Sequence, residues 1–303
     1  MKITDSWLDS GGTMTEQDFL KQYNIKDYER PSIATDIAVF SIAEKKEENY
    51  RKDPDSVLKL LLIRRDAYPY KDSWALPGGF LRSDETPLKA AFRELKEETG
   101  VEGAYLRILD IFGNPGRDPR GWIISNAYLA LIDSTEYKVH AGSDAWEAEW
   151  FEIDVDTIDS EREADGNDIK RTITYKITLT GEDDVKFNTI VKRRVNYVHF
   201  HEESEYEIVE NDNLAFDHPE IILRAFLALR DSAEKDGRII FDFLPEYFTF
   251  AKVQKAFETV LGRELLVANF RRKMAEYVIE TDKNDTISGH RPAKLFVRNV
   301  EKF

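Results

Sequence analysis

Three glutamates, Glu94, Glu97 and Glu98, lie within five residues of one another in the segment RELKEETGV, residues 93–101. Carboxylates this close repel one another unless a cation joins them, and hard oxygen ligands of this kind suit Mg²⁺ or Mn²⁺. Such ions keep bound water and bridge to substrate phosphates, so the pattern predicts metal-assisted attack of water on a phosphoanhydride. The alternative is a solvated helix face, which is the commoner use of a glutamate-rich helix.

A helix from residue 87 to about residue 99 is predicted to carry these glutamates. Thr86 is a suitable N-cap, Pro87 suits the first helical position, and Gly100 is a suitable stop. At about 100° per residue, the three carboxylates share one side of this helix. The apolar stripe expected to face the core consists of Leu88, Ala91, Phe92 and Leu95. The glutamates are therefore expected at the margin of the buried face, where a cleft would open.

Two neighbouring features support a site of this kind. The turn at Gly78 and Gly79 lets the backbone approach the carboxylates closely. Arg93 precedes Glu97 by four residues, so it can orient and partly neutralise the cluster on the helix surface.

The segment from Gly79 to Val101 resembles the complete Nudix box. The resemblance implies an α/β fold, the α/β/α Nudix sandwich, and hydrolysis of a nucleoside diphosphate linked to another group. In that family the matching glutamates of the helix bind Mg²⁺ or Mn²⁺ or activate water, and two further positions support them. The catalytic residues implied here are Glu85, Arg93, Glu94, Glu97 and Glu98, and the metal ligands are Glu94, Glu97, Glu98 and the backbone of Gly79.

Arg117 and Arg120 are candidate substrate-binding residues. They lie beside Gly and Pro turns in residues 113–131, where two guanidinium groups could clamp phosphates bidentately. The alternative is a structured surface loop with ordinary ion pairs. The segment is similar to the corresponding loop and strand of ADP-ribose pyrophosphatase-like Nudix proteins, which implies ADP-ribose or a related small molecule as the substrate.

Composition excludes several other classes of site. The chain has 303 residues and no cysteine, so disulfides and thiolate metal sites are excluded. No apolar run approaches the roughly 20 residues of a membrane span, and the N-terminus lacks an apolar signal segment. A cytoplasmic protein is therefore expected. The net charge of −15 divides into −18 for residues 1–236 and +3 for residues 237–303.

The pattern of strands and helices predicts two domains, residues 1–236 and a smaller winged helix-turn-helix domain at 237–303, and the resemblance of the box implies that the first is a Nudix domain. The first contains a β-rich insert at about 155–210 and a helix that begins after Asp217, a suitable N-cap. Strands are predicted near 33–42, 57–64, 104–112, 122–132 and 146–153.

In the tail, two helices separated by Gly262 precede a short hairpin, which is the winged-helix pattern. The second helix, about 267–278, is predicted to read DNA, while Phe270, Met274 and Tyr277 face the core of the tail. The candidate DNA-binding residues are Asn269, Arg271, Arg272, Lys273, His290, Arg291 and Lys294.

Most of the chain resembles the Nudix-related transcriptional regulators of NAD and sugar metabolism. The resemblance implies that the winged helix binds operator DNA and that the Nudix domain senses a ligand such as ADP-ribose. A twofold operator would require a homodimer. Two functions remain open: a Mg²⁺-dependent hydrolase and a ligand-sensing regulator. A winged helix used only for dimerisation or protein contact is the alternative to DNA binding.

Overall fold

The computed structural model describes residues 15–44, 56–102, 104–133, 145–165, 168–181, 185–198, 201–285 and 293–303. The chain divides into two compact units, residues 1–31 and 32–303. The first unit contains helix α1 (Glu16–Gln22) and a short 3-10 helix (Ile25–Asp27), and none of its described residues is buried. Helix α1 begins at Thr15, whose hydroxyl accepts a hydrogen bond from the Asp18 N–H.

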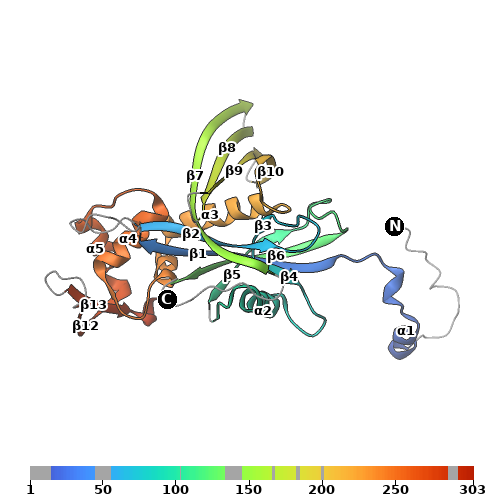
Figure 1. Cartoon of the computed structure of the whole chain (residues 1–303), viewed down its shortest axis with the longest axis horizontal. Coiled ribbons are helices and arrows are strands. Elements are labelled where there is room, and N and C mark those ends of the chain that lie inside the picture. The colour runs from blue at the N-terminus through green and yellow to red at the C-terminus, as the bar shows by residue number, and fades with distance from the viewer. Residues whose placement is uncertain are drawn as a thin grey trace. The chain divides into compact units, whose positions relative to one another are not determined.

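A mixed β-sheet forms the centre of the second unit (Figure 1). Over the described residues it has ten strands, in the order β10-β9-β8-β7-β2-β1-β6-β5, with β3 paired to β2 and β4 to β1. The strands are β1 (Ser32–Glu44), β2 (Ser56–Arg65), β3 (Trp74–Ala75), β4 (Gly78–Phe80), β5 (Tyr105–Phe112), β6 (Ile123–Ile132), β7 (Ala145–Asp165), β8 (Asp168–Thr180), β9 (Lys186–Val198) and β10 (His201–Asn211). Strands β1 and β6 run parallel.

Alternate residues of the central strands pack on opposite faces of this sheet. Ile37 and Val39 of β1 pack on the side of helix α2 (Pro87–Thr99). Ala38 and Phe40 pack on the side of helix α3 (His218–Lys235). The two helices thus cover opposite faces (Figure 1), and the predicted α/β/α sandwich is confirmed.

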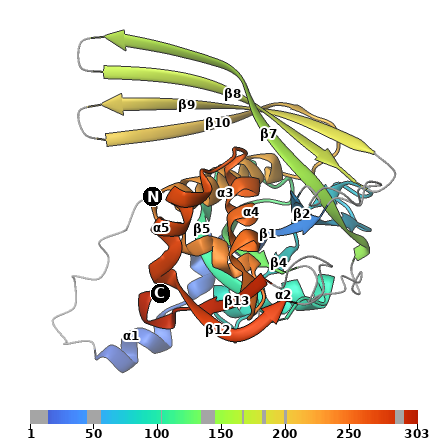
Figure 2. The ribbon, with the colours of Figure 1, turned by 90° about the vertical axis from the view of Figure 1, so that its left-hand side faces the viewer.

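Strands β7 to β10 occupy the segment in which a β-rich insert was expected. They continue the central sheet, and β7 alone has 21 residues. Near α3 these strands bury Ile177, Leu179 and Val191 in the main core. Figure 2 shows their far ends projecting beyond the helices. The insert is therefore an extension of the Nudix sheet.

The C-terminal part forms the predicted winged helix. Gly262 ends the first of its two helices with a φ of 67°, in the left-handed region that glycine adopts readily. The elements are a 3-10 helix (Arg238–Phe243), β11 (Phe248–Thr249), α4 (Phe250–Leu261), α5 (Val267–Met274), a 3-10 helix (Ala275–Tyr277), β12 (Val278–Asp285), β13 (Ala293–Arg298) and a 3-10 helix (Val300–Lys302). None of the helices in the described ranges combines the length and the apolar composition needed to cross a membrane.

One hydrophobic cluster joins the Nudix sheet to the winged helix. It contains Phe40 of β1 and Leu229 of α3 together with Phe241, Phe257 and Phe270. The rings of Phe257 and Phe270 hold α4 against α5, with centroids 5.1 Å apart. The domain boundary at residues 236 and 237 stays a prediction, because core residues from both sides of it pack together.

The buried face of α2 differs from the predicted apolar stripe. Leu88 and Phe92 are exposed, whereas Ala90 and Ala91 are completely buried. Small side chains at these positions let the helix lie close to the sheet. The buried face is rotated accordingly, so Glu98 belongs to it, with 8% of its surface exposed, instead of lying at its margin.

Candidate functional site

Strand β4 holds a glycine backbone directly against the glutamate helix. Gly78 pairs with Asp36 of β1, and Gly79 pairs with Thr35. A Cβ atom at Gly78 would lie 2.1 Å from the Thr35 carbonyl oxygen, and one at Gly79 would lie 2.4 Å from Glu94 Oε1. At Gly78 the clash is with backbone, so only glycine fits there, whereas a side chain at Gly79 would displace the Glu94 carboxylate.

Arg93 joins three of the predicted catalytic carboxylates. Its guanidinium donates two hydrogen bonds to Glu85, from Nε at 3.0 Å and from Nη2 at 2.5 Å. Nη1 donates to Glu94 Oε1 at 2.6 Å and to Glu97 Oε2 at 3.1 Å. The hydrogen bonds to Glu85 above all raise the pKa of Arg93 above its usual value. This fixed positive charge compensates the clustered carboxylates.

The third glutamate of the helix is held separately. Glu98 Oε2 accepts a hydrogen bond of 2.7 Å from the Gly78 N–H, which ties the carboxylate to the β4 backbone. Burial raises the pKa of the neighbouring Glu94, although its hydrogen bond from Arg93 acts in the opposite direction. The three glutamates therefore have different surroundings on one face of α2.

The donor atoms of this site suit Mg²⁺ or Mn²⁺. They are carboxylate oxygens of the glutamate helix, and Glu94 Oε1 lies only 2.4 Å from where a Cβ atom of residue 79 would stand. Mg²⁺ and Mn²⁺ prefer oxygen ligands. In the described parts of the chain, no group of three or more acidic or histidine side chains is already arranged around a common point. Glu97 is bonded to Arg93 but its side chain is 45% exposed, so it has room to turn toward an ion. Metal binding by these residues stays a prediction.

The ion pair of Glu85 with Arg93 is expected to stabilise the folded protein at neutral pH and to lose this effect in acid. The hydrogen bonds from Arg93 lower the pKa of Glu85 from 4.5 to about 2. Because the folded-state pKa is the lower one, this stabilisation is complete above the unfolded-state value of 4.5 and is lost as the pH falls toward 2. The thermal unfolding midpoint of Glu85→Gln should therefore fall less than that of the wild type over this pH range. Parallel curves for the two proteins would contradict the assignment.

A cavity of about 110 Å³ lies next to the glutamate helix. It is enclosed by the ends of β1 and β2, by β4, by the loop between β5 and β6, and by the start of α3. Its charged and aromatic lining residues are Asp36, Arg65, Phe80, Arg117, Asp118, Arg120, Phe216 and His218.

Arg117 ties three of these elements together. Its Nε and Nη2 atoms donate to the two oxygens of Asp217 at 2.7 Å each, and Nη2 also donates to Asp36 Oδ2 at 3.1 Å. His218 Nδ1 accepts from the Leu76 N–H at 2.9 Å, which leaves its proton on Nε2, 3.4 Å from Asp36 Oδ1. Burial by itself raises the pKa of Asp36, but His218 and Arg117 outweigh it and the pKa lies well below 3.8.

The two predicted phosphate ligands thus differ in their surroundings. The Arg117 side chain is 5% exposed and is engaged by two carboxylates. Asp217 occupies the predicted N-cap position of α3, but its side chain makes no capping hydrogen bond, because both carboxylate oxygens accept from Arg117. Arg120 is 41% exposed, bonds both oxygens of Asp118, and lies 5.0 Å from the centroid of the Phe80 ring. Phosphate binding by Arg117 and Arg120 stays a prediction, and the geometry favours Arg120.

Two further residues of the pocket, Arg65 and Phe216, were not among the predicted site residues. The guanidinium carbons of Arg65 and Arg120 lie 4.9 and 5.4 Å from the centroid of the Phe216 ring. Burial lowers the pKa of Arg65, and the nearby charge of Arg120 lowers it further. Both guanidinium groups line the cavity, and their like charges favour an anion there. Arg65 could have been found from the sequence, because it is a cation directly after the apolar strand 57–64. Nothing in the sequence marks Phe216, which has an unusual positive φ of 52°.

Helix α5 presents the predicted DNA-binding residues to solvent. Phe270 and Met274 are buried, as predicted. Lys294 lies on β13 and is 50% exposed. His290 and Arg291 lie outside the described residues. The exposed residues of α5 include Asn269, Arg271, Arg272 and Lys273.

Comparisons with known proteins match both parts of the chain. The family model of the NUDIX domain matches residues 51–171, and that of the NrtR DNA-binding winged helix domain matches residues 240–297. The crystal structure of a MutT/nudix family protein from Enterococcus faecalis is 30% identical, and the alignment covers 94% of each chain with a TM-score of 0.65.

Two curated relatives extend this result. The ADP-ribose pyrophosphatase of Methanocaldococcus jannaschii is 40% identical over 134 residues, which are 44% of this chain and 68% of the relative. The ADPR responsive transcriptional repressor NtrR of Acinetobacter baylyi is 30% identical over 285 residues, 93% of this chain and 88% of the relative. With both domains matched and a full-length relative covered, the chain belongs to the NrtR family, in which a Nudix domain precedes a winged helix domain.

Proposed function

We propose that the Nudix pocket binds ADP-ribose or a related nucleoside diphosphate derivative and that the protein hydrolyses its diphosphate with Mg²⁺ or Mn²⁺. The observation that carries this proposal is the intact glutamate cluster of α2 beside the β4 glycines, next to a cavity that holds two adjacent guanidinium groups. The similarity to an ADP-ribose pyrophosphatase supports the choice of substrate.

Each part of this site has a separate task in the proposed reaction. Arg65 and Arg120 bind the diphosphate, because both guanidinium groups line the cavity. Glu98 accepts the proton of the attacking water, and its bond to Gly78 fixes the carboxylate for this step. Arg93, itself held by Glu85, fixes the positions of the Glu94 and Glu97 carboxylates through hydrogen bonds. A bound divalent ion would neutralise phosphate charge and lower the pKa of the water.

A substrate panel tests this proposal. The purified protein is incubated with Mg²⁺ and ADP-ribose, other ADP-sugars or NADH, and the products are separated by chromatography. AMP and ribose phosphate are the expected products from ADP-ribose. Absence of turnover across the whole panel, with either Mg²⁺ or Mn²⁺, would contradict the catalytic proposal.

We also propose that the protein is a DNA-binding regulator that responds to this ligand. The observation that favours this second function is the winged helix, whose α5 exposes Asn269, Arg272 and Lys273 while burying Phe270 and Met274. Residues near the start of such a helix read base edges in the major groove. The similarity to an ADPR responsive transcriptional repressor supports the role. A homodimer stays a prediction.

Replacing Arg272 by Ala is expected to weaken binding to the protein's own upstream DNA by about 5- to 150-fold. Losing one base or phosphate contact of an arginine costs roughly 1–3 kcal/mol. The measurement is a mobility-shift titration at physiological salt, with and without ADP-ribose. Arg263→Ala is the matched control, because Arg263 is 61% exposed and pairs only with Glu234 among the described residues. Equal affinities of the two variants would rule out α5 as the recognition helix.

A further inference from the structure

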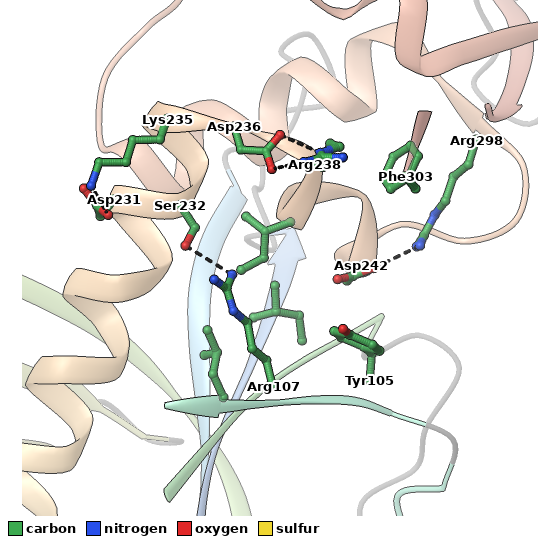
Figure 3. Close-up of a pocket in the computed structure, with 13 residues that line it drawn as sticks. Tyr105, Arg107, Asp231, Ser232, Lys235, Asp236, Arg238, Asp242, Arg298 and Phe303 are labelled. Atoms are coloured by element: carbon green, nitrogen blue, oxygen red, sulfur yellow. Dashed lines mark hydrogen bonds and ion pairs between the residues drawn. The ribbon is translucent and has the colours of Figure 1, made fainter. Parts of the chain in front are cut away.

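A second cavity, of about 630 Å³, lies where the Nudix sheet meets the C-terminal residues (Figure 3). None of its lining residues lines the pocket beside the glutamate helix. Helix α3 contributes His218 to that pocket and Ser232 to this cavity, about 21 Å further along the helix at 1.5 Å per residue. Small-molecule sites commonly have volumes of about 300–1,000 Å³ and lie at junctions between domains.

The apolar part of this cavity suits a flat ring. Leu129 and Leu131 of β6 and Ile239 line it, and the two leucines are each 4% exposed. Tyr105 and Phe303 add aromatic rings that are 67% and 46% exposed. Figure 3 shows these two rings on the same side of the cavity. Phe303 already packs edge-on against Phe241, at 5.3 Å between centroids, but it remains partly exposed. An apolar surface flanked by exposed aromatic residues favours a planar group, because aromatic rings pack in offset or edge-to-face pairs.

One cation of the lining, Arg107, makes no ion pair with a described residue, although its charge, after the hydrogen bonds from Arg238, helps to lower the pKa of the Asp236 carboxyl. Arg107 lies on edge strand β5 and donates from Nη1 to Ser232 Oγ at 3.4 Å. A guanidinium has five N–H donors, so most of those of Arg107 remain available. The other three cations of the lining are already neutralised, in the pairs Lys235–Asp231 at 2.8 Å, Arg238–Asp236 at 2.6 Å and Arg298–Asp242 at 2.9 Å.

We propose that this cavity is a second ligand site, which binds a small anion carrying a planar ring. The carboxylate or phosphate of the ligand bonds to Arg107 and Ser232, and its ring packs against Tyr105, Phe303 and the leucines. Because the lining comes from the Nudix sheet and from the C-terminal residues, a bound ligand links the two parts of the molecule. The proposal requires neither hydrolysis nor DNA binding.

Calorimetric titration of the full chain with phenyl phosphate and with benzoate tests the proposal. Saturable one-site binding of at least one of these probes is expected, and the comparison between them distinguishes a phosphate ligand from a carboxylate ligand. Inorganic phosphate, which lacks the ring, and benzyl alcohol, which lacks the charge, should each bind at least about tenfold more weakly. No binding of either probe at millimolar concentration overturns the proposal.

Arg107→Gln should weaken binding of the probe at least about tenfold, because a charge-assisted hydrogen bond is lost. Arg171→Gln is the matched control: Arg171 is also exposed and donates to a serine hydroxyl, Ser160, at 3.4 Å, but lies outside the cavity. Tyr105→Ala should also weaken binding. Arg120→Ala, in the Nudix pocket, should leave it unchanged. Binding that survives Arg107→Gln but is lost in Arg120→Ala would place the probe in the Nudix pocket and overturn the proposal.

Discussion

Replacing Glu98 by Gln should slow ADP-ribose hydrolysis by about 100-fold or more while leaving the fold intact. General-base catalysis contributes about 10²–10⁴-fold, and an amide can neither take a proton from water nor supply negative charge. Glutamine has the same shape, so its side-chain oxygen can still accept the 2.7 Å hydrogen bond from Gly78. The measurement is the initial rate of AMP release with Mg²⁺, alongside the thermal unfolding midpoint of each protein.

Glu102→Gln provides the control for this experiment. Glu102 follows the same helix, is 64% exposed, and pairs with Lys96 at 2.8 Å away from the pocket. Its rate should match that of the wild type. If Glu98→Gln hydrolyses ADP-ribose as fast as Glu102→Gln, then Glu98 has no part in the reaction.

Replacing Arg117 by Met is expected to lower the free energy of unfolding by about 3–5 kcal/mol. This is the usual cost of removing one partner from a buried ion pair, since the remaining charge stays buried without compensation. Here the Asp36 and Asp217 side chains are each 12% exposed and both pair with Arg117, while Asp36 also faces His218 at 3.4 Å. Denaturant unfolding at neutral pH measures the change.

Two further variants test whether the loss of stability comes from the buried charges. Arg64→Met removes a surface pair with Glu147, whose atoms are 3.7 Å apart and whose side chains are nearly half exposed, so a loss below about 1 kcal/mol is expected. Adding Asp217→Asn to Arg117→Met should recover part of the lost stability, because one uncompensated charge is removed. If Arg117→Met unfolds like the wild type but binds ADP-ribose poorly, Arg117 is a ligand for the substrate and the buried network has little effect on stability.

The ends of α2 were predictable because they depend on near neighbours. Thr86 accepts a hydrogen bond from the Lys89 N–H, Pro87 occupies the first turn, and Gly100 ends the helix with a φ of 75°. The winged-helix core was predictable for a similar reason: Phe270 and Met274 recur at helical spacing on a short helix that has only one face to bury. Local periodicity and capping settle such features.

Features that depend on distant parts of the chain were not predictable in this way. The sheet surface under α2 accepts alanines and excludes Leu88 and Phe92, and nothing in the helix itself reveals that. The role of Arg117 depends on Asp36 and Asp217, which lie 81 and 100 residues away in the sequence. A loop arginine beside glycines predicts phosphate binding from the sequence, whereas its contacts with these two carboxylates are visible only in the folded chain.

The hydrophobic cluster shared by the sheet and the winged helix has a consequence for how such proteins diversify. Residues such as Phe241 and Phe257 pack in the same core as Phe40 of the sheet. Replacing residues 240–303 by an unrelated DNA-binding module would uncover this apolar face and favour aggregation of the hybrid. Changes within residues 240–303 must therefore preserve the inner faces of α4 and α5. On the proposal that α5 contacts operator DNA, new operator preferences are more readily acquired through outward side chains such as Arg272 than through exchange of whole modules.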